Sequence, residues 1–258
     1  MNVLKRLVGF DTPDPANYVA PDAPQGATGP AALEMTYLGT AGFVLRGAGR
    51  TLVLDPYVTR PDLLTTLTRP LAPDAALIRQ LIPQADDVLV GHAHHDHILD
   101  APELCRQTGA RLIGSRSAMM VGRAAGLPES QLRETAGGED IIQSGSWTVR
   151  GLPSRHGKVF GRIPLPGDID APPPWPVRLT GFRHGLVLNW LVDTGALTVA
   201  HIDSADFIDD ELRGHRCDVL CLCAIGRKYR PNYTRDAIAL LKPRWVVPCH
   251  WDSMFTPI

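Results

Sequence analysis

The chain has 258 residues, of which 44% are hydrophobic and 21% are charged, and its formal net charge at pH 7 is −1. This length suits one large domain with a buried core, and the near-neutral charge gives no general attraction to nucleic acid or acidic membranes. The five cysteines are an odd number, which argues against a disulfide framework and favours a reducing, cytoplasmic compartment. No stretch is long and apolar enough to span a bilayer, and residues 1–10 lack the apolar run of a secretory signal.

The beginning of the chain differs in composition from the rest. Residues 11–30 are rich in Pro, Gly, Ala and Asp and show no apolar periodicity. We therefore expect residues 1–32 to form an irregular N-terminal arm. The remaining residues, 33–258, are expected to form a single domain, because the length of the chain suits one large domain better than two small ones.

The next part of the chain predicts a β-meander and then alternating strands and helices. Apolar or β-branched runs between glycines predict strands at 33–38, 43–45 and 51–54. A helix is expected at 73–82 with Asp74 as a cap near its start, followed by a buried strand at 88–90. The elements expected after it are a helix at 98–108, a strand at 111–113, a helix at 115–125 and a strand at 147–152.

A proline-rich segment interrupts this alternation. Residues 160–180 contain six prolines, which are excluded from helix interiors and central strands, so we expect a long loop. Such a loop serves either as a lid or binding loop or as a solvated insertion, and the sequence leaves both open. The elements expected after it are strands at 185–192, 197–202 and 219–223, a helix at 234–241 capped by Thr234, and a strand at 245–247. The alternation indicates an α/β protein with layered architecture.

The sequence His92-Ala93-His94-His95-Asp96-His97 directly follows the apolar run at 88–90. Four imidazoles and a carboxylate in six residues are difficult to explain as core packing, because buried polar groups need partners. Histidine is the commonest metal ligand near neutral pH, and the aspartate adds an oxygen donor. The cluster therefore predicts a metal site at the end of a strand.

One loop cannot complete a coordination sphere, so further ligands must come from distant parts of the sequence. Three residues share one context, an apolar strand followed by a ligand-type side chain: His156, Asp203 and His250. Strand ends at one edge of a layered sheet converge, so these loops can build one pocket. Asp193 is a rival to Asp203, but its place in a turn signal favours Asp203.

The order of these residues resembles the ligand pattern of the metallo-β-lactamase superfamily, and the resemblance extends over about residues 34–252. Residues 37–43 and 54–56 further resemble the opening hairpins of one branch. That branch includes ascorbate-6-phosphate lactonase-like proteins and the N-acyl-phosphatidylethanolamine-hydrolysing phospholipase D. The resemblance implies a four-layer αββα sandwich, with the metals at one edge between the two sheets.

Carried over to this chain, the family pattern implies two metal sites. The residues that would bind the first ion are His92, His94 and His156, and those that would bind the second are Asp96, His97 and His250. Asp203 would bridge the two ions, although Ile202 stands where the family usually has a glycine before this aspartate. His95 would point away from the metals. Asp55 either hydrogen-bonds a ligating histidine or simply forms a turn.

These donors imply a dinuclear metal-dependent hydrolase. Two divalent ions, zinc by donor type with manganese or iron also accommodated, would share a hydroxide that attacks an ester, lactone or phosphodiester. Asp96 would hold this nucleophile and move its proton, which makes Asp96 the expected catalytic residue. The alternatives on the same fold are a metal-dependent nuclease and a redox or oxygen-binding iron protein, and the absence of a basic appendage counts against the nuclease.

The expected substrate is a small or lipid-like molecule, and no nucleic-acid partner is expected. Several basic or aromatic residues near the predicted site loops leave open an anionic group on the substrate. These residues are Arg155, Lys158, Arg227, Lys228, Tyr229 and Arg230. The alternative for them is a solvated charged surface.

Overall fold

The first of two large sheets is built from the N-terminal half of the chain, with strand order β1-β2-β3-β5-β6-β7. The computed structural model describes residues 33–159 and 161–256, so the arm expected at residues 1–32 lies outside the described residues. The strands are β1 (Glu34–Gly39), β2 (Gly42–Gly47), β3 (Arg50–Leu54), β5 (Asp87–Leu89), β6 (Arg111–Gly114) and β7 (Leu132–Glu134). The first three pair antiparallel as the predicted meander, and β3, β5, β6 and β7 pair in parallel.

The second sheet comes from the C-terminal half, with strand order β14-β13-β12-β11-β9-β8. Its strands are β8 (Ile141–Ser144), β9 (Trp147–Ser154), β11 (Val187–Asp193), β12 (Thr198–Ile202), β13 (Val219–Cys223) and β14 (Trp245–Cys249). Strands β8, β9, β11 and β12 pair antiparallel, whereas β12, β13 and β14 pair in parallel. It follows that β9, β12 and β14 run in the same direction and end at the same edge of the sheet.

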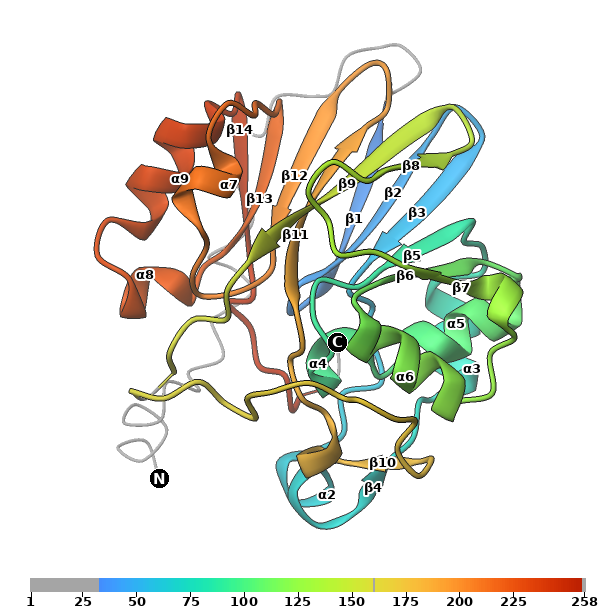
Figure 1. Ribbon diagram of the computed structural model, residues 1–258. Helices are drawn as coiled ribbons and strands as arrows, with labels where there is room; N and C mark the ends of the chain where they lie inside the picture. Colours follow the sequence, from blue (N-terminus) through green and yellow to red (C-terminus); the bar gives the residue numbers. More distant parts are fainter. Residues whose placement is uncertain (1–32, 160, 257–258) are drawn as a thin grey trace, which may run out of the picture.

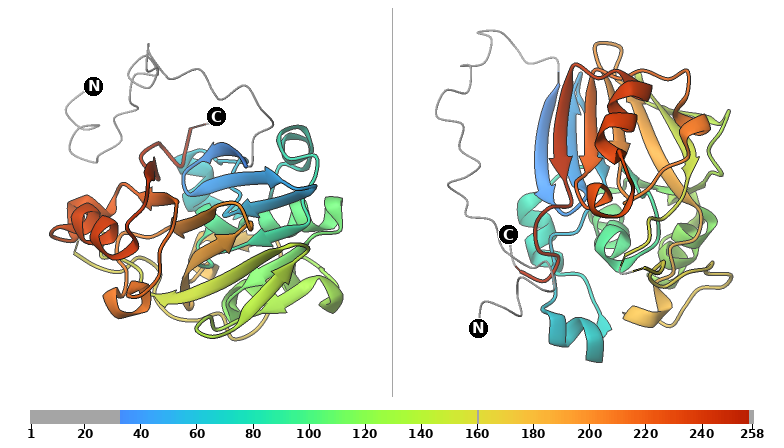
Figure 2. Two further views of the ribbon diagram at one scale, coloured as in Figure 1. Left: turned by 90° about the horizontal axis from the view of Figure 1, so that it is seen from above. Right: turned by 90° about the vertical axis from the view of Figure 1, so that its left-hand side faces the viewer.

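Helices cover the outer face of each sheet (Figures 1 and 2). The described α-helices are α2 (Leu63–Thr68), α3 (Ala75–Leu81), α4 (His95–Ile98), α5 (Ala101–Thr108), α6 (Arg116–Ala124), α7 (Asp209–Leu212), α8 (Gly226–Tyr229) and α9 (Tyr233–Leu241). The predicted cap of α3 is confirmed, because Asp74 accepts hydrogen bonds from the backbone N–H groups of Ala76 and Leu77 at 3.0 Å. The predicted cap Thr234 is wrong, since α9 begins one residue earlier and follows Asn232, whose φ is +57°.

Three hydrophobic clusters separate the layers. The cluster between the sheets contains the fully buried Trp147 and Trp190. A second joins the first sheet to α3, α5 and α6 through residues such as Ile78 and Leu104, and a third joins the second sheet to α7 and α9 through residues such as Leu212. Each buried aliphatic side chain stabilises the fold by roughly 1.5–3 kcal/mol. This layering is the αββα sandwich that the sequence predicted.

The proline-rich segment is more ordered than the expected loop. Within it, β10 (Val177–Arg178) pairs with β4 (Pro70–Leu71), and a 3₁₀ helix follows at Leu179–Gly181. The guanidinium of Arg178 also donates a hydrogen bond to the carbonyl oxygen of Thr68 in α2 at 2.9 Å. These elements escaped prediction because two-residue strands have no periodicity to detect. Of the helices that the structure describes, none has the length and apolarity needed to cross a membrane.

Candidate metal centre

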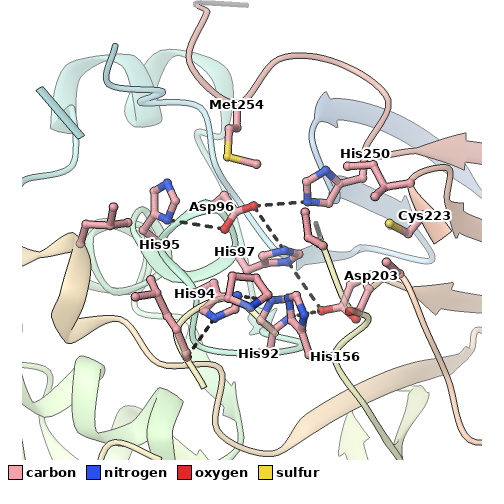
Figure 3. Close-up of a pocket in the computed structure, with 17 residues that line it drawn as sticks. His92, His94, His95, Asp96, His97, His156, Asp203, Cys223, His250 and Met254 are labelled. Atoms are coloured by element: carbon pink, nitrogen blue, oxygen red, sulfur yellow. Dashed lines mark hydrogen bonds and ion pairs between the residues drawn. The ribbon is translucent and has the colours of Figure 1, made fainter. Parts of the chain in front are cut away.

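Four donors lie in the short connection that follows β5. This strand brings His92 to the edge of the first sheet, and the single-turn helix α4 then carries Asp96 and His97. Three further donors follow strands of the second sheet that end at the same edge: His156 after β9, Asp203 after β12 and His250 after β14. Figure 3 shows the labelled side chains meeting from these separate segments.

The donor atoms lie close enough together to bind common cations. Atoms within 4.8 Å of one another form three overlapping groups: His92, His94 and His156; His92, His97 and Asp203; and Asp96, His97 and His250. All seven residues line one cavity of about 320 Å³. The structure therefore brings together the seven favoured metal-ligand candidates, at the edge where the strand-end argument placed them.

Within the groups, some donor atoms are at hydrogen-bonding distance from one another, and others have the spacing of two ligands on one cation. His92 Nδ1 lies 2.6 Å from Asp203 Oδ2, and His92 Nε2 lies 3.0 Å from His94 Nδ1. Asp96 Oδ2 lies 3.3 Å from His250 Nε2 and 3.6 Å from His97 Nε2. Two donors on one tetrahedral zinc are separated by about 3.3 Å, given bond lengths of about 2.0–2.1 Å. The Asp96 group already has this spacing.

The protonation states of four of the donors suit metal binding: His92, His94, His156 and Asp96. Burial lowers the pKa of His156 to about 4 and holds the pKa values of His92 and His94 well below the ordinary range. Burial acts to raise the pKa of Asp96, but His97 and other neighbouring histidines outweigh it and hold that pKa well below its usual value. Neutral imidazole and ionised carboxylate are the forms that coordinate cations.

Two buried donor atoms have no hydrogen-bond partner among the described residues, namely Asp203 Oδ1 and His250 Nδ1. An unpartnered buried polar atom costs about 1–3 kcal/mol, so such atoms need an explanation. Asp203 belongs to the group that overlaps both of the others, and a cation between these groups would satisfy its free oxygen. The nitrogen and carboxylate donors suit zinc, manganese or iron.

Asp55 orients His97 from behind the centre. One carboxylate oxygen lies 2.9 Å from His97 Nδ1, and the other accepts a hydrogen bond from the backbone N–H of Gly91 at 2.7 Å. Burial opposes charge on His97, but the carboxylates of Asp96 and Asp55 outweigh it and raise the pKa of His97 to about 9. Of the two roles that the sequence left open for Asp55, the hydrogen bond to histidine is present. Its φ of +41° shows that the chain also turns there.

Gly91 gives Asp203 the room to approach the first sheet. A Cβ atom at position 91 would lie 2.2 Å from Asp203 Oδ2, so any other residue would displace this carboxylate. The family pattern led us to expect a glycine immediately before the bridging aspartate, where Ile202 stands. In this protein the glycine that permits close packing lies on the opposite side of the site.

The family model described as "Beta-lactamase superfamily domain" matches residues 34–250, a range that includes all seven donors. The chain belongs to the metallo-β-lactamase superfamily. A UPF0173 metal-dependent hydrolase of Anaeromyxobacter sp. (strain K) is 31% identical over 241 residues, which cover 90% of this chain and 78% of the relative. A UPF0173 metal-dependent hydrolase of Pyrobaculum arsenaticum is 28% identical over 225 residues, covering 86% and 85%.

One solved structure with a similar fold is Igni18, described as a metallo hydrolase from Ignicoccus hospitalis. It superposes with a TM-score of 0.59 at 21% identity, covering 84% of this chain and 82% of Igni18. CmlA, a diiron β-hydroxylase from Streptomyces venezuelae, superposes with a TM-score of 0.53 at 17% identity, covering 86% and 45%. At these identities the likeness establishes the fold alone. The branch predicted from the opening hairpins stays a prediction.

Two residues considered for the site, His95 and Asp193, belong to none of the donor groups. His95 belongs to none of the three donor groups, but it lines the same cavity rather than pointing away, with Nδ1 3.6 Å from Asp96 Oδ1. Asp193 lies in an exposed turn, where its carboxylate accepts the backbone N–H of Gly195 at 2.8 Å. This aspartate is therefore a turn former and takes no part in the centre.

The basic residues considered for anion binding do not line the cavity. The guanidinium of Arg230 lies 2.8 Å from Asp206 and is stacked on the ring of Phe207, and Arg155 lies 3.8 Å from the same aspartate. Arg227 and Lys228 line a separate surface hollow beside α8 and α9. Lys158 and Tyr229 are also absent from the cavity lining, so none of the six residues considered for anion binding faces the donors within the described cavity.

The sequence reasoning missed two features beside the centre. The ring of His184 is stacked on that of His156 with centroids 5.7 Å apart, and no signal marked it because it precedes a strand instead of following one. Asp252 forms the second feature, which we term the tail clamp, together with Tyr37 and Arg60. The Tyr37 hydroxyl donates to Asp252 at 2.9 Å, and Arg60 pairs with it at 2.8 Å.

The tail clamp fixes the chain that carries His250. Asp252 also accepts the backbone N–H of Thr40 at 2.8 Å, and the Thr40 carbonyl accepts the backbone N–H of His250 at 2.5 Å. His250 itself has a φ of +53°, a conformation that needs support from its surroundings. The opening hairpin of the first sheet therefore positions a donor that arrives at the end of the second sheet.

Proposed function

We propose that this protein is a metal-dependent hydrolase whose centre holds two divalent cations. The observation that carries this proposal is the convergence of three overlapping donor groups in one cavity. It is supported by relatives 31% and 28% identical that are named metal-dependent hydrolases. A small cavity at the edge of two sheets is also the usual form of a small-molecule site.

The donor groups suggest which residues hold each cation. His92, His94 and His156 would hold one cation, and Asp96, His97 and His250 would hold the other. Asp203 would contact both, because its group shares His92 with the first set and His97 with the second. Zinc is the cation we favour for these nitrogen and carboxylate donors, and manganese or iron suit them as well.

Hydrolysis of an ester, lactone or phosphodiester is the chemistry we assign to the centre. A bound pair of cations lowers the pKa of water to about 7 and polarises a substrate oxygen, which is what such hydrolysis needs. Asp96 is buried at the centre of its group, where its ionised carboxylate can accept a hydrogen bond from the attacking water and take its proton. Asp55 keeps His97 in the orientation that faces Asp96.

Replacing Asp96 tests this proposal. Asp96→Asn and Asp96→Ala should each lower kcat by about 100-fold or more while the circular dichroism spectrum is unchanged, because a positioned acid–base group contributes about that much. The substrates are a panel of lactones, phosphodiesters and N-acyl phospholipids, with enzyme loaded with zinc, manganese or iron. Asp193→Asn, in the exposed turn, is the matched control and should retain full activity.

Two results would contradict the proposal. Full metal-dependent turnover by Asp96→Asn would remove the catalytic role of this carboxylate. Elemental analysis of the loaded enzyme should give two cations per chain, and a maximum of one would refute the two-cation centre.

A second candidate is oxygen chemistry at an iron pair. Its support is the fold shared with CmlA, a diiron β-hydroxylase, together with donors that also suit iron. Protein purified without added metal distinguishes the two functions. Zinc content with hydrolysis in the absence of oxygen excludes the second candidate, whereas iron content with oxygen consumption excludes the first.

A further inference from the structure

Away from the donors, the wall of the cavity is almost entirely apolar. Apart from the seven donors and His95, the residues lining it are Val159, Pro164, Leu165, Leu179, Ser204, Ala205, Cys223, Ile225 and Met254. Among the residues that the structure describes, no lysine or arginine lines this cavity. The wall therefore offers dispersion and hydrophobic contact to a ligand, with the Ser204 hydroxyl as its one uncharged polar side chain.

The apolar wall begins directly beside the donors. The carbonyl oxygen of Leu165 lies 3.4 Å from His94 Nε2 and accepts the backbone N–H of His184 at 3.3 Å, which fixes the proline-rich segment against the centre. Leu179 comes from the 3₁₀ helix of the same segment, and Met254 comes from the chain after the tail clamp. All three are only partly buried, so apolar surface remains facing the cavity.

Four of the nearby cations contact or line other parts of the surface, and the exposed Lys158 is not among the residues that line the cavity. Arg155 and Arg230 share the carboxylate of Asp206, and Arg227 and Lys228 line the separate hollow beside α8 and α9. Among the residues that the structure describes, the cavity wall therefore places no lysine or arginine next to a phosphate group bound at the centre. Arg and Lys side chains strengthen the binding of a phosphoryl group where they lie beside it, and an ester needs no such cation.

We propose that the substrate is a neutral ester or lactone with an apolar acyl group, and that this group binds along Leu165, Leu179 and Met254. The inference rests on the proposed hydrolase function, because it names the substrate class of the same site. It makes Leu165 and Leu179 residues that determine specificity. It also excludes phosphodiesters from the range of preferred substrates.

A chain-length series tests this inference with the unmodified enzyme. For zinc-loaded protein and p-nitrophenyl esters from acetate to octanoate, kcat/KM should rise about fourfold for each methylene until the cavity is filled. Bis(p-nitrophenyl) phosphate should be turned over more slowly than the best ester. A flat series, or a preference for the phosphodiester, would overturn the inference while leaving the hydrolase function intact.

Binding gives a readout that needs no turnover. Alkyl hydroxamates from acetyl to octanoyl combine a metal-binding head with the same series of tails, and calorimetry measures their Kd. The Kd should fall about fourfold per methylene, with an increasingly negative heat-capacity change as apolar surface is buried. This dependence without hydrolysis of any substrate would support the apolar site and contradict the hydrolase function. An equal Kd for all tails would contradict the apolar site.

Charged substitutions in the cavity wall test where the alkyl chain of the ligand binds. Leu165→Lys and, independently, Leu179→Lys should weaken octanoyl hydroxamate at least tenfold and leave acetyl hydroxamate within twofold. Leu197→Lys is the matched control, because this half-buried leucine precedes β12 and lies at the opposite end of that strand from Asp203. Unchanged octanoyl binding in both folded cavity variants would overturn the assignment of the wall.

Discussion

Asp55 shows how a single residue outside the donor set controls the centre. Asp55→Asn preserves the side-chain size and an acceptor for the Gly91 N–H, but an amide N–H then replaces the oxygen that faces His97. We expect zinc to bind about 10–100-fold more weakly, because partners of ligating histidines typically contribute that much. A competition titration against a chromophoric chelator measures the change. Asp193→Asn should bind like the wild type, and equal affinity in Asp55→Asn would show that Asp55 has no such role.

Asp100 lies outside the centre and carries a separate pH effect. It is fully buried, and its carboxylate accepts the backbone N–H groups of Val58 at 2.6 Å and Thr59 at 2.8 Å. Burial is the main cause that raises the pKa of Asp100 to about 6, above its ordinary value of 3.8. The folded state therefore binds the proton more tightly than the unfolded state does. The resulting stability is complete below about pH 3.8 and is lost as the pH rises through about 6.

The wild type should accordingly lose up to about 3 kcal/mol relative to Asp100→Asn between pH 4 and pH 7. Asparagine preserves the side-chain shape and an acceptor for the two backbone groups, but it does not titrate. Urea unfolding of the metal-free proteins across this range gives the difference in free energy of unfolding. A difference that does not depend on pH would contradict the assignment of this shift to Asp100.

At the level of residues, the donors could be predicted because they lie in the segments that follow strands. Each of these strands is recognisable in the sequence by its apolar run. His92 and Asp203 needed only this rule and the ligand chemistry of their side chains. His184 and Arg60 escaped prediction, because they meet their partners only through the packing of separate segments. The position of His95 on the cavity wall was not predicted for a similar reason, because it depends on the path of α4.

Among the elements, the segment after β14 depends on the tail clamp. The Arg60 side chain is 4% exposed and pairs with the Asp252 carboxylate, so Asp252→Ala would leave a buried charge without its partner. We expect a loss of about 3–5 kcal/mol in the free energy of unfolding, measured by urea denaturation. Glu34→Ala removes the partner of Arg46, a pair that is 31% and 61% exposed, and should cost at most about 1 kcal/mol. Equal effects of the two substitutions would argue against the clamp.

The boundaries of elements were predicted less well than their order. One helix was expected at 98–108, whereas the structure has α4 and α5, with residues 99 and 100 between them. The end of α5 at residue 108 is as predicted, and Gly109 closes the helix with a φ of +79°. The short strands β4 and β10 were missed because pairing across about 100 residues of sequence, not local periodicity, defines them. Helix α2 has only six residues, too few to show a helical period.

At the scale of the whole molecule, the two halves of the chain share one interior. The cluster between the sheets includes Phe43 from the first sheet and Trp190 from the second. We therefore propose that residues 33–258 fold as a single domain, as the length of the chain suggested. The metal centre also draws on both halves. The motif at 92–97 follows a strand of the first sheet, and three donors follow strands of the second: His156, Asp203 and His250.

Cations at the centre should thus stabilise both halves together. A ligand that binds only the folded state adds about 4.1 kcal/mol at a free concentration 1,000 times its Kd. We expect a chelator to lower the Tm of zinc-loaded protein by several degrees, as measured by calorimetry. His215→Ala, a histidine outside the centre, should respond like the wild type, whereas His250→Ala should respond much less. An identical response of all three proteins would contradict a shared metal site.

The three residues proposed to bind the acyl group and the metal donors belong to different segments of the chain. The donors lie immediately after strands of the two sheets, whereas Leu165, Leu179 and Met254 belong to segments that join or follow them. Substitutions in these segments leave every ligand position untouched. Evolution can therefore change what this enzyme accepts without changing the reaction it performs. The same division makes the proline-rich segment the natural place to begin when redesigning its selectivity.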